Sequence, residues 1–492
     1  MAFSRRRFIQ WAASVSTLAI AGPAGTRSLA LVAGNSADTL RPGLLPSRKK
    51  VWDDLAWMAK LGPKYTGNKA HTTFIEFLAT ELKATGLDVA RDRYTFPRWD
   101  ARRSEITITP SRSSSGPAFK APVTSYFPYS GQTPVAGVTG ELVYAGSHPT
   151  FNLDDVRDKV VLVDFAINTR EWARLYQRWG VNPPDEPFPP AVRPVRAAVS
   201  DLTPFQKAGA VGVILAWTDV SDANAAEQYT PFSRPPQGIP GLYVGRDTGA
   251  QLRKLAGSGA RATVVLEAAV FPDTPTDTLI ATLPGMSDEV IIVNTHTDGP
   301  NATEENGAIG ILALARYFSR IPKTERQRTL VFPLTTGHFA APWVPSIRGV
   351  IEKHPDVIKK AVAALTVEHL GCREWMDDAS FNYSATGKNE WSIAITPLKS
   401  MGQIMVDALK GSLDRAAAVN PVNGGWLGEG GSLSRAGVPT IGYIPQPNYL
   451  LVGAADGCIG KLSPELLHSQ IQVFAKVIHK IDTMTVASLK GI

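Results

Sequence analysis

The sequence predicts an α/β fold with a separate β-rich domain. The apolar run 290–293 predicts a buried strand, and helical periodicity from Gly307 to Phe318 predicts a helix soon after it. Between residues 100 and 275 the pattern changes to short β-rich runs separated by turn residues. A chain of 492 residues with 44% hydrophobic composition is long enough to bury a large core in more than one domain.

The N-terminus has the features of an export signal. Residues 4–10 read Ser-Arg-Arg-Arg-Phe-Ile-Gln, and the apolar segment Trp11 to Ala24 is too short to span a membrane stably. Residues 1–30 are therefore interpreted as a twin-arginine signal, which predicts a periplasmic or secreted protein with no membrane anchor after its removal. Removal of this segment lowers the net charge from +7 to +3, because it carries four arginines and no acidic residue. Nucleic acid is not an implied partner of so mildly basic a chain.

After a linker at 31–49, residues 50–95 predict a helix, a turn at 61–68, a second helix and a strand. The second helix is expected at 73–85, with apolar residues at helical spacing and Gly86 as its stop. The β-rich region predicts three strands and one short helix, and the Trp- and Pro-containing segment 168–198 predicts a loop that overhangs the site. The elements expected in this region are strands at 160–165, 211–216 and 240–244 and a helix at 202–209.

The α/β pattern resumes at residue 276, with strands expected at 279–283 and 290–294. The two cysteines, Cys372 and Cys458, lie in no Cys-x-x-Cys or Cys-His context and are interpreted as structural. An oxidising compartment allows a disulfide between them but does not assign one.

Polar side chains gather in the connection between the central strand and its helix. His296, Asp298, Glu304 and Glu305 all lie there, which is where open α/β sheets place their sites. An imidazole and several carboxylates suit a divalent metal, and Asp298 is placed to orient the ring of His296 through its other nitrogen. The alternative is a polar loop that contains one histidine with satisfied hydrogen bonds.

The residues His296-Thr-Asp298 and Glu305-Asn-Gly-Ala-Ile-Gly310 resemble the motifs of the co-catalytic zinc exopeptidases, a family of bacterial aminopeptidases, glutamate carboxypeptidase and glutaminyl cyclases. The resemblance implies a mixed sheet flanked by helices. The phrases 158–162 and 207–214 are similar to a protease-associated domain, which implies that residues 130–275 are inserted between the two parts of the peptidase-like domain, 50–129 and 276–492.

The chain departs from the family pattern at several metal positions. The family's Thr-Gly-Glu-Glu reads Thr336-Gly337-His338-Phe339 here, so His338 takes the place of the general base or, with a shift of one residue, that of a ligand. A ligand Asp is replaced by Glu368, and His369 is expected to point away from it, as the next residue on a strand does. Glu429 stands at the Asp of a Ser-Asp-His segment, and Tyr449-Leu-Leu-Val452 replaces the terminal His ligand.

The resemblance therefore implies one zinc ion, held by His296, Glu305 and Glu368, with the second metal position degraded. His338, Glu304 and Asp298 are the expected catalytic residues, and Glu429 and His369 are expected to line the site. We expect an exported metallopeptidase-like hydrolase that cleaves an amide bond in a small-molecule or peptide-like substrate.

Two alternatives remain. One is a binding protein that has lost catalysis, as transferrin receptor and nicastrin have, and the other is an acyl transfer enzyme similar to glutaminyl cyclase. A serine hydrolase and other zinc classes are disfavoured, because the sequence contains neither Gly-x-Ser-x-Gly nor His-Glu-x-x-His.

Overall fold

The structure is a computed structural model that describes residues 40–111, 116–167, 170–192, 201–422 and 424–492. The expected twin-arginine signal and most of the linker lie outside the described residues. No helix in the described part of the chain is long and apolar enough to cross a membrane.

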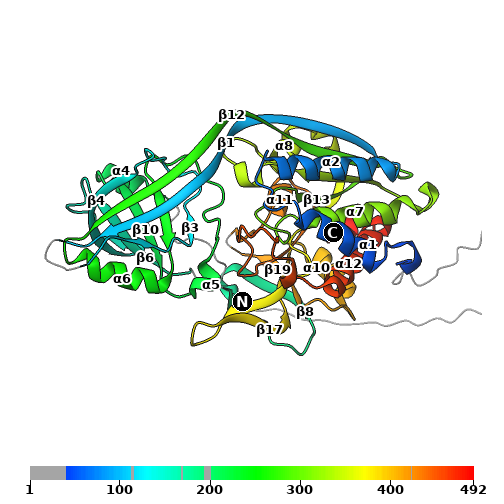
Figure 1. The fold of residues 1–492 in the computed structure, drawn as a ribbon. Helices are drawn as coiled ribbons and strands as arrows, with labels where there is room; N and C mark the ends of the chain where they lie inside the picture. Colours follow the sequence, from blue (N-terminus) through cyan, green and yellow to red (C-terminus); the bar gives the residue numbers. More distant parts are fainter. Residues whose placement is uncertain (1–39, 112–115, 168–169, 193–200, 423) are drawn as a thin grey trace, which may run out of the picture. The chain divides into compact units, whose positions relative to one another are not determined.

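A mixed sheet of 16 strands connects most of the β structure (Figure 1). Its main path runs in the order β3-β11-β10-β6-β4-β12-β14-β13-β15-β20-β18-β19-β8, and β1, β2 and β5 pair at its sides. The strands are β1 (Asp88–Thr109), β2 (Phe119–Ala121), β3 (Ser125–Tyr126), β4 (Val138–Ser147), β5 (Thr150–Phe151), β6 (Val160–Phe165), β8 (Tyr176–Asn182), β10 (Gly212–Trp217), β11 (Gly241–Val244), β12 (Arg261–Leu283), β13 (Val290–His296), β14 (Thr329–Thr335), β15 (Ala361–Val367), β18 (Ser392–Ile395), β19 (Ala416–Pro421) and β20 (Thr440–Pro445).

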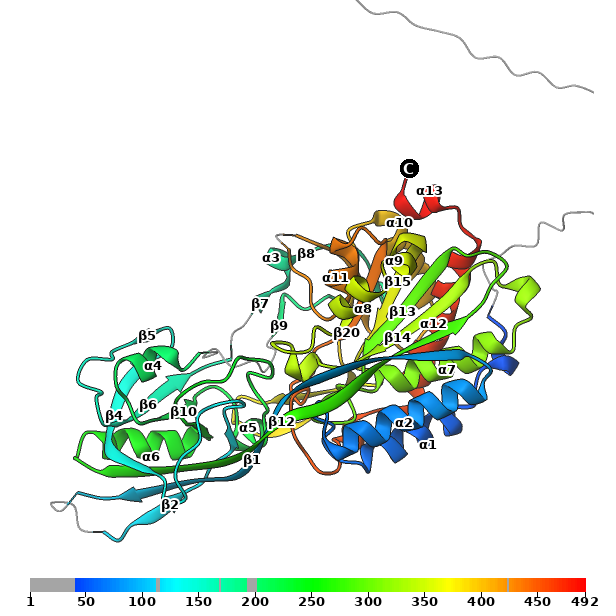
Figure 2. The same cartoon turned by 90° about the horizontal axis from the view of Figure 1, so that it is seen from above.

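The centre of the sheet is parallel and is covered by helices on both faces (Figure 2). Along β13, Ile291 and Val293 pack into one core, while Val290 and Ile292 pack into another, as the two-residue period of a strand requires. The first core is formed with α1 (Arg48–Ala59), α2 (Lys69–Ala84), α7 (Gly307–Ser319), α10 (Lys399–Leu409) and α12 (Pro464–Thr483), and the second with α8 (Ile347–Lys353) and α11 (Gly430–Arg435). These layers bury the strands completely, which explains the continuous apolar runs in the sequence.

Two long strands, β1 and β12, form an antiparallel ribbon that joins the β-rich region to the central sheet. One end of β12 pairs with β4, and its other end pairs with β14. The β-rich region has two further cores of its own and adds α4 (Thr203–Lys207), α5 (Asp222–Ala225) and α6 (Arg246–Ala256). The expected domain boundaries at residues 130 and 275 stay predictions, since β12 continues across the second of them.

Segment 168–198 differs from the expected loop wherever it is described. It forms β7 (Arg170–Glu171), α3 (Trp172–Leu175), β8 and β9 (Ala191–Val192), and β8 is the last strand on the path of the large sheet. Trp172 and Tyr176 are buried against Ile393 and Val419, which explains why this aromatic-rich stretch is ordered as an edge strand.

The other elements are β16 (Arg373–Asp377), β17 (Tyr383–Asn389), α9 (Pro355–Lys360), α13 (Val486–Lys490), and the short 3-10 helices η1 (Pro42–Leu44), η2 (Lys323–Glu325), η3 (His338–Ala340) and η4 (Ile459–Lys461). Cys372 and Cys458 are both buried and free. The structure therefore contains no disulfide between them.

Candidate functional site

The carboxyl ends of β13, β14 and β15 lie side by side in the parallel part of the sheet and carry the polar residues of the site. His296 is the last residue of β13, His338 follows β14 after Gly337, and Glu368 and His369 follow β15. The connection from β13 to α7 adds Glu304. Chain direction and strand order thus bring together residues from separate segments.

His296 is fully buried, and its tautomer is set by the main chain. Its Nδ1 lies 2.9 Å from the carbonyl oxygen of Asp298, which only accepts hydrogen bonds, so Nδ1 carries a proton. The lone pair of a neutral ring is then on Nε2, which lies 3.8 Å from Oε2 of Glu368.

His369 lies on the same side as Glu368 because the backbone turns sharply between the strand and the next loop. Its φ angle is +58°, and the amide of Asn306 holds the turn by bonding both the N–H and the carbonyl of Leu370. Nδ1 of His369 faces the carbonyl of Pro445 at 3.0 Å. Its Nε2 therefore points to Oε2 of Glu304, at 3.0 Å, and Oε2 of Glu368, at 3.9 Å.

Glu304 is positioned by Asn301. The side-chain Oδ1 of Asn301 accepts hydrogen bonds from the main-chain N–H groups of Thr303 and Glu304, while its Nδ2 donates to the main-chain carbonyls of Tyr449 and Leu450. This network ties the β13–α7 connection to the segment that follows β20. Asn301 and Asn306 thus place Glu304 and His369 through backbone hydrogen bonds.

These four side chains fit a divalent cation. Nε2 of His296, Oε2 of Glu304, Oε2 of Glu368 and Nε2 of His369 are all buried, and apart from the ion-pair contact between Glu304 and His369 they have no hydrogen-bond partner among the described residues. Buried polar atoms without partners are costly unless a cation joins them. Ligand atoms of His296, Glu368 and His369 lie within 4.8 Å of one another, as do those of His296, Glu304 and His338, and imidazole with carboxylate is a zinc donor set.

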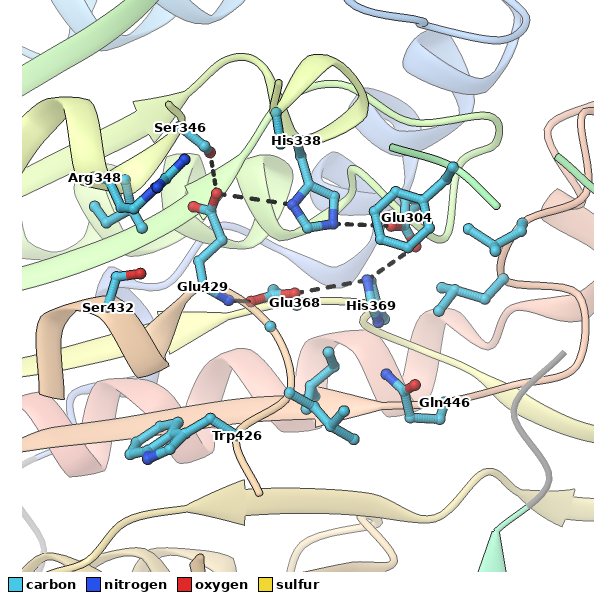
Figure 3. Close-up of a pocket in the computed structure, with 18 of the residues that line it drawn as sticks. Glu304, His338, Ser346, Arg348, Glu368, His369, Trp426, Glu429, Ser432 and Gln446 are labelled. Atoms are coloured by element: carbon cyan, nitrogen blue, oxygen red, sulfur yellow. Dashed lines mark hydrogen bonds and ion pairs between the residues drawn. The ribbon is translucent and has the colours of Figure 1, made fainter. Parts of the chain in front are cut away.

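His338 lies between two carboxylates at the mouth of this cluster (Figure 3). Its Nε2 is 3.8 Å from Oε1 of Glu304, and its Nδ1 is 3.9 Å from Oε1 of Glu429. Its ring stacks on that of His296, with centroids 4.1 Å apart, and Phe232 from the β-rich region covers its other side at 5.1 Å. The side chain is 21% exposed, so it can meet both the buried cluster and the pocket.

Glu429 is buried and held by hydroxyl groups. It accepts hydrogen bonds from Ser346 and, at 2.8 Å, from Thr335, and its main-chain N–H donates to Glu368 at 2.9 Å. Burial raises the pKa of Glu429 to about 7, against the opposing effect of His296. Ser346 has a φ angle of +49°, a strained conformation for a serine, and this conformation accompanies its contact with the site.

The cluster of carboxylates also changes the basicity of the buried rings. Burial lowers the pKa of His296, but Glu304, Glu368 and Glu429 outweigh it and raise the pKa to about 9. In the same way, Glu304 and Glu368 overcome burial and raise the pKa of His369. Both rings therefore attract a cation at Nε2, whether a proton or a metal ion.

A pocket of about 250 Å³ opens onto this cluster. Its polar wall includes Glu304, His338, Glu368, His369 and Glu429, and Figure 3 shows Arg348 and Ser432 on the Glu429 side. Its apolar lining includes Phe232, Trp426, Leu427, Ile444, Leu450 and Leu451. Leu450 and Leu451 belong to the segment where the resemblance implies a histidine in the family.

Two of the expected site residues face elsewhere. Glu305 is turned toward Lys64, with Oε1 2.5 Å from Nζ, and Glu304 contacts the histidines instead. The carboxylate of Asp298 accepts hydrogen bonds from Thr66 and from the N–H of Phe339, while only its main-chain carbonyl orients His296. Asp298 thus holds the turn that carries His338.

His369 does not point away from Glu368, as alternation along a strand predicts, because β15 ends at Val367. The Gly371 that follows has a φ angle of +77°, and the Leu-Gly pair was the available signal for a turn. The role of Ser346 depends on contacts across 83 positions of sequence, and no local motif indicates it.

Comparison with known proteins agrees with this architecture. A family model described as the PA domain matches residues 138–252, and no curated protein matches the chain in sequence. The zinc aminopeptidase BSAP from Bacillus subtilis is 15% identical, with a TM-score of 0.60 over 90% of this chain and 98% of its own. The peptidase M28 precursor from Shewanella amazonensis SB2B is 15% identical, with a TM-score of 0.62 over 89% and 93%. The aminopeptidase from Aneurinibacillus sp. strain AM-1 is 16% identical, with a TM-score of 0.56 over 88% and 93%.

Likeness at such low identity shows the fold. It confirms the predicted mixed sheet flanked by helices, and the PA-domain match confirms the predicted protease-associated domain. The protein therefore has the fold of the zinc aminopeptidases and carries a PA domain, as expected of a co-catalytic zinc exopeptidase-like family.

Proposed function

We propose that the protein is an exported hydrolase that uses a single zinc ion to cleave an amide bond in a small-molecule or peptide-like substrate. The observation that carries this proposal is the convergence of His296, Glu304, Glu368 and His369 at the carboxyl ends of parallel strands. Nitrogen and carboxylate oxygen atoms of this cluster would hold the ion, which when bound polarises a carbonyl group and lowers the pKa of a water molecule.

The tautomer of His296 supports one ion rather than two. Both candidate groups include His296, but its Nδ1 donates to the carbonyl of Asp298, which leaves Nε2 as its only ligand atom. The single lone pair on Nε2 of His296 can bind only one ion. The ion therefore binds either with Glu368 and His369 or with Glu304 and His338, but both groups cannot be filled through His296 at once. We favour the group with His369, because Asn306 and Pro445 hold its Nε2 toward the carboxylates.

His338 is the proton carrier in this proposal. Its two nitrogens face Glu304 and Glu429, so a proton taken up at one nitrogen can be matched by release at the other. The ring of His338 stacks on the ring of His296 and on that of Phe232, and these contacts fix the plane of the His338 ring. Glu429 is held by Ser346 and Thr335 and keeps a carboxylate beside Nδ1, which stabilises the ring when it is protonated.

Twin-arginine export is part of the proposal and rests on residues 4–10. That route accepts folded, metal-loaded proteins, in keeping with a site assembled from distant segments. Replacing both Arg5 and Arg6 by Lys should retain the protein in the cytoplasm. Normal export of this double variant through an intact twin-arginine machinery would contradict the proposed route.

The function is tested with an unbiased library of peptides and acylated amines, comparing the zinc-loaded mature protein with His296→Ala. We expect hydrolysis by the wild-type protein and its loss, together with the metal, in the variant. His148→Ala is a matched control, since His148 is exposed and lies outside the site pocket. Metal binding without hydrolysis would instead indicate a binding protein, and hydrolysis unchanged in His296→Ala would reject the metal.

A further inference from the structure

Lys64 is a buried lysine whose ammonium group lies beside the proposed metal centre. Lys64 and Glu305 are both fully buried, and Nζ of Lys64 is 2.5 Å from Oε1 of Glu305. Glu305 directly follows Glu304, whose carboxylate contacts His369 and faces His338. A buried lysine thus neutralises one of two adjacent carboxylates, while the other is free to face the histidines.

The structure holds this ammonium group from several directions. Nζ also donates to the carbonyls of Gly62, at 2.8 Å, and Met58, at 3.3 Å, so its three donors have acceptors. The main chain of Lys64 exchanges two hydrogen bonds with Gly299, at 2.8 and 3.0 Å. Gly299 has to be small, because a Cβ atom there would lie 2.5 Å from Oε2 of Glu305 and 2.6 Å from Cγ of Glu304.

The surroundings of Lys64 are strongly acidic. Five carboxylates are buried in and around the site, those of Asp298, Glu304, Glu305, Glu368 and Glu429. In the described part of the chain, Lys64 is the one lysine or arginine that forms an ion pair with any of them. The positive charge of Lys64 therefore compensates the buried negative charge of Glu305, as a second metal cation would otherwise do.

We propose that Lys64 is a built-in cation that holds Glu305 away from the metal-binding side chains and so limits the site to one divalent ion. This inference rests on the proposed function. Without the ammonium group, Glu305 would be a buried carboxylate whose Oε2 has no hydrogen-bond partner among the described residues. Together with Glu304 and His338 it would then offer ligands for a second ion.

The test measures zinc per chain in the full mature protein, after equilibration with excess zinc and desalting, together with the melting temperature with and without zinc. The wild-type protein should hold one ion and Lys64→Met two. Zinc should also raise the melting temperature of Lys64→Met by more than that of the wild type, because a second ion binds only its folded state. The double variant Lys64→Met/Glu305→Gln removes both charges and should return to one ion.

Arg316→Met is the matched control. Arg316 forms a buried ion pair with Asp54 outside the site, so its loss should lower the melting temperature without adding a zinc ion or a larger zinc response. One ion in Lys64→Met, or two in the double variant, would overturn the inference and leave the proposed function standing. Two ions in the wild type would overturn the inference and also the single-ion part of the proposed function. A wild-type protein without zinc would overturn both.

Discussion

Stability should fall steeply in mild acid because of His71, which joins the N-terminal helix α2 to the central sheet. His71 is fully buried, and its two nitrogens have different fixed partners. Nδ1 accepts the N–H of Gly67 at 3.0 Å. Nε2 lies 2.9 Å from the hydroxyl of Thr297, which itself donates to the carbonyl of Thr335, so Nε2 carries the proton. A second proton on Nδ1 would point at the N–H of Gly67.

Burial is the main reason that the pKa of His71 is lowered from 6.5 to about 4. The folded state thus resists protonation, and the unfolded state binds the proton first as the pH falls. The contribution of His71 to stability is complete above pH 6.5 and is lost between pH 6.5 and about 4. Over this range the free energy of unfolding falls by about 1.4 kcal/mol per pH unit, so the total loss of stability is roughly 3 kcal/mol.

Urea denaturation from pH 4 to 8 measures this effect as a difference between the wild-type protein and His71→Gln, which cannot titrate. Below pH 6.5 we expect the free energy of unfolding to fall more steeply with pH in the wild type than in the variant. The variant should be less stable than the wild type at pH 7, but its stability should depend less on pH. His148→Gln, which alters an exposed histidine, should keep the wild-type slope. Parallel curves for the wild type and His71→Gln would show that protonation of His71 does not cause the loss of stability.

Three further predictions concern the site and its support. His338→Ala should keep zinc but lower kcat about 10²–10⁴-fold, as loss of a proton carrier does, and zinc loss on elemental analysis would instead identify His338 as a ligand. Asp298→Ala should lower the free energy of unfolding by about 1–3 kcal/mol in urea, since it leaves the buried N–H of Phe339 without its acceptor, and an unchanged value would contradict that role. Gly307→Ala should cost about 1–3 kcal/mol, because its Cβ would lie 2.2 Å from the carbonyl of Val367 and force α7 off the sheet. Gly43→Ala, with nothing within 4 Å, is its control, and equal effects of the two substitutions would contradict the packing argument.

The elements around the central strand could be predicted from sequence because each carries a local pattern, whereas the strands and helix within segment 168–198 were expected as a loop. The apolar run at β13 and the periodicity of α7 come from burial on both faces of the sheet and on one helix face, and both are visible in a short window. The length of β12 was not predictable in this way. Its middle section pairs mainly with β1, and its exposed residues there have no strong alternation.

The residues of the site were found more easily than their roles. His296, Glu304 and Glu368 stand near strand ends, which sequence can locate, but the choice between Glu304 and Glu305 depends on Lys64, more than 200 positions away. The orientation of His369 depends on one backbone angle and on the amide of Asn306. Such decisions come from tertiary contacts, which a single sequence does not encode in any local pattern.

The most direct test of the central claim is a zinc-edge anomalous diffraction map of the zinc-loaded crystal. We predict one peak per chain, about 2.0–2.2 Å from Nε2 of His296 and Nε2 of His369 and within the same reach of Glu368. Two peaks, a peak bound by Glu305, or no peak at these side chains would contradict the single-zinc site.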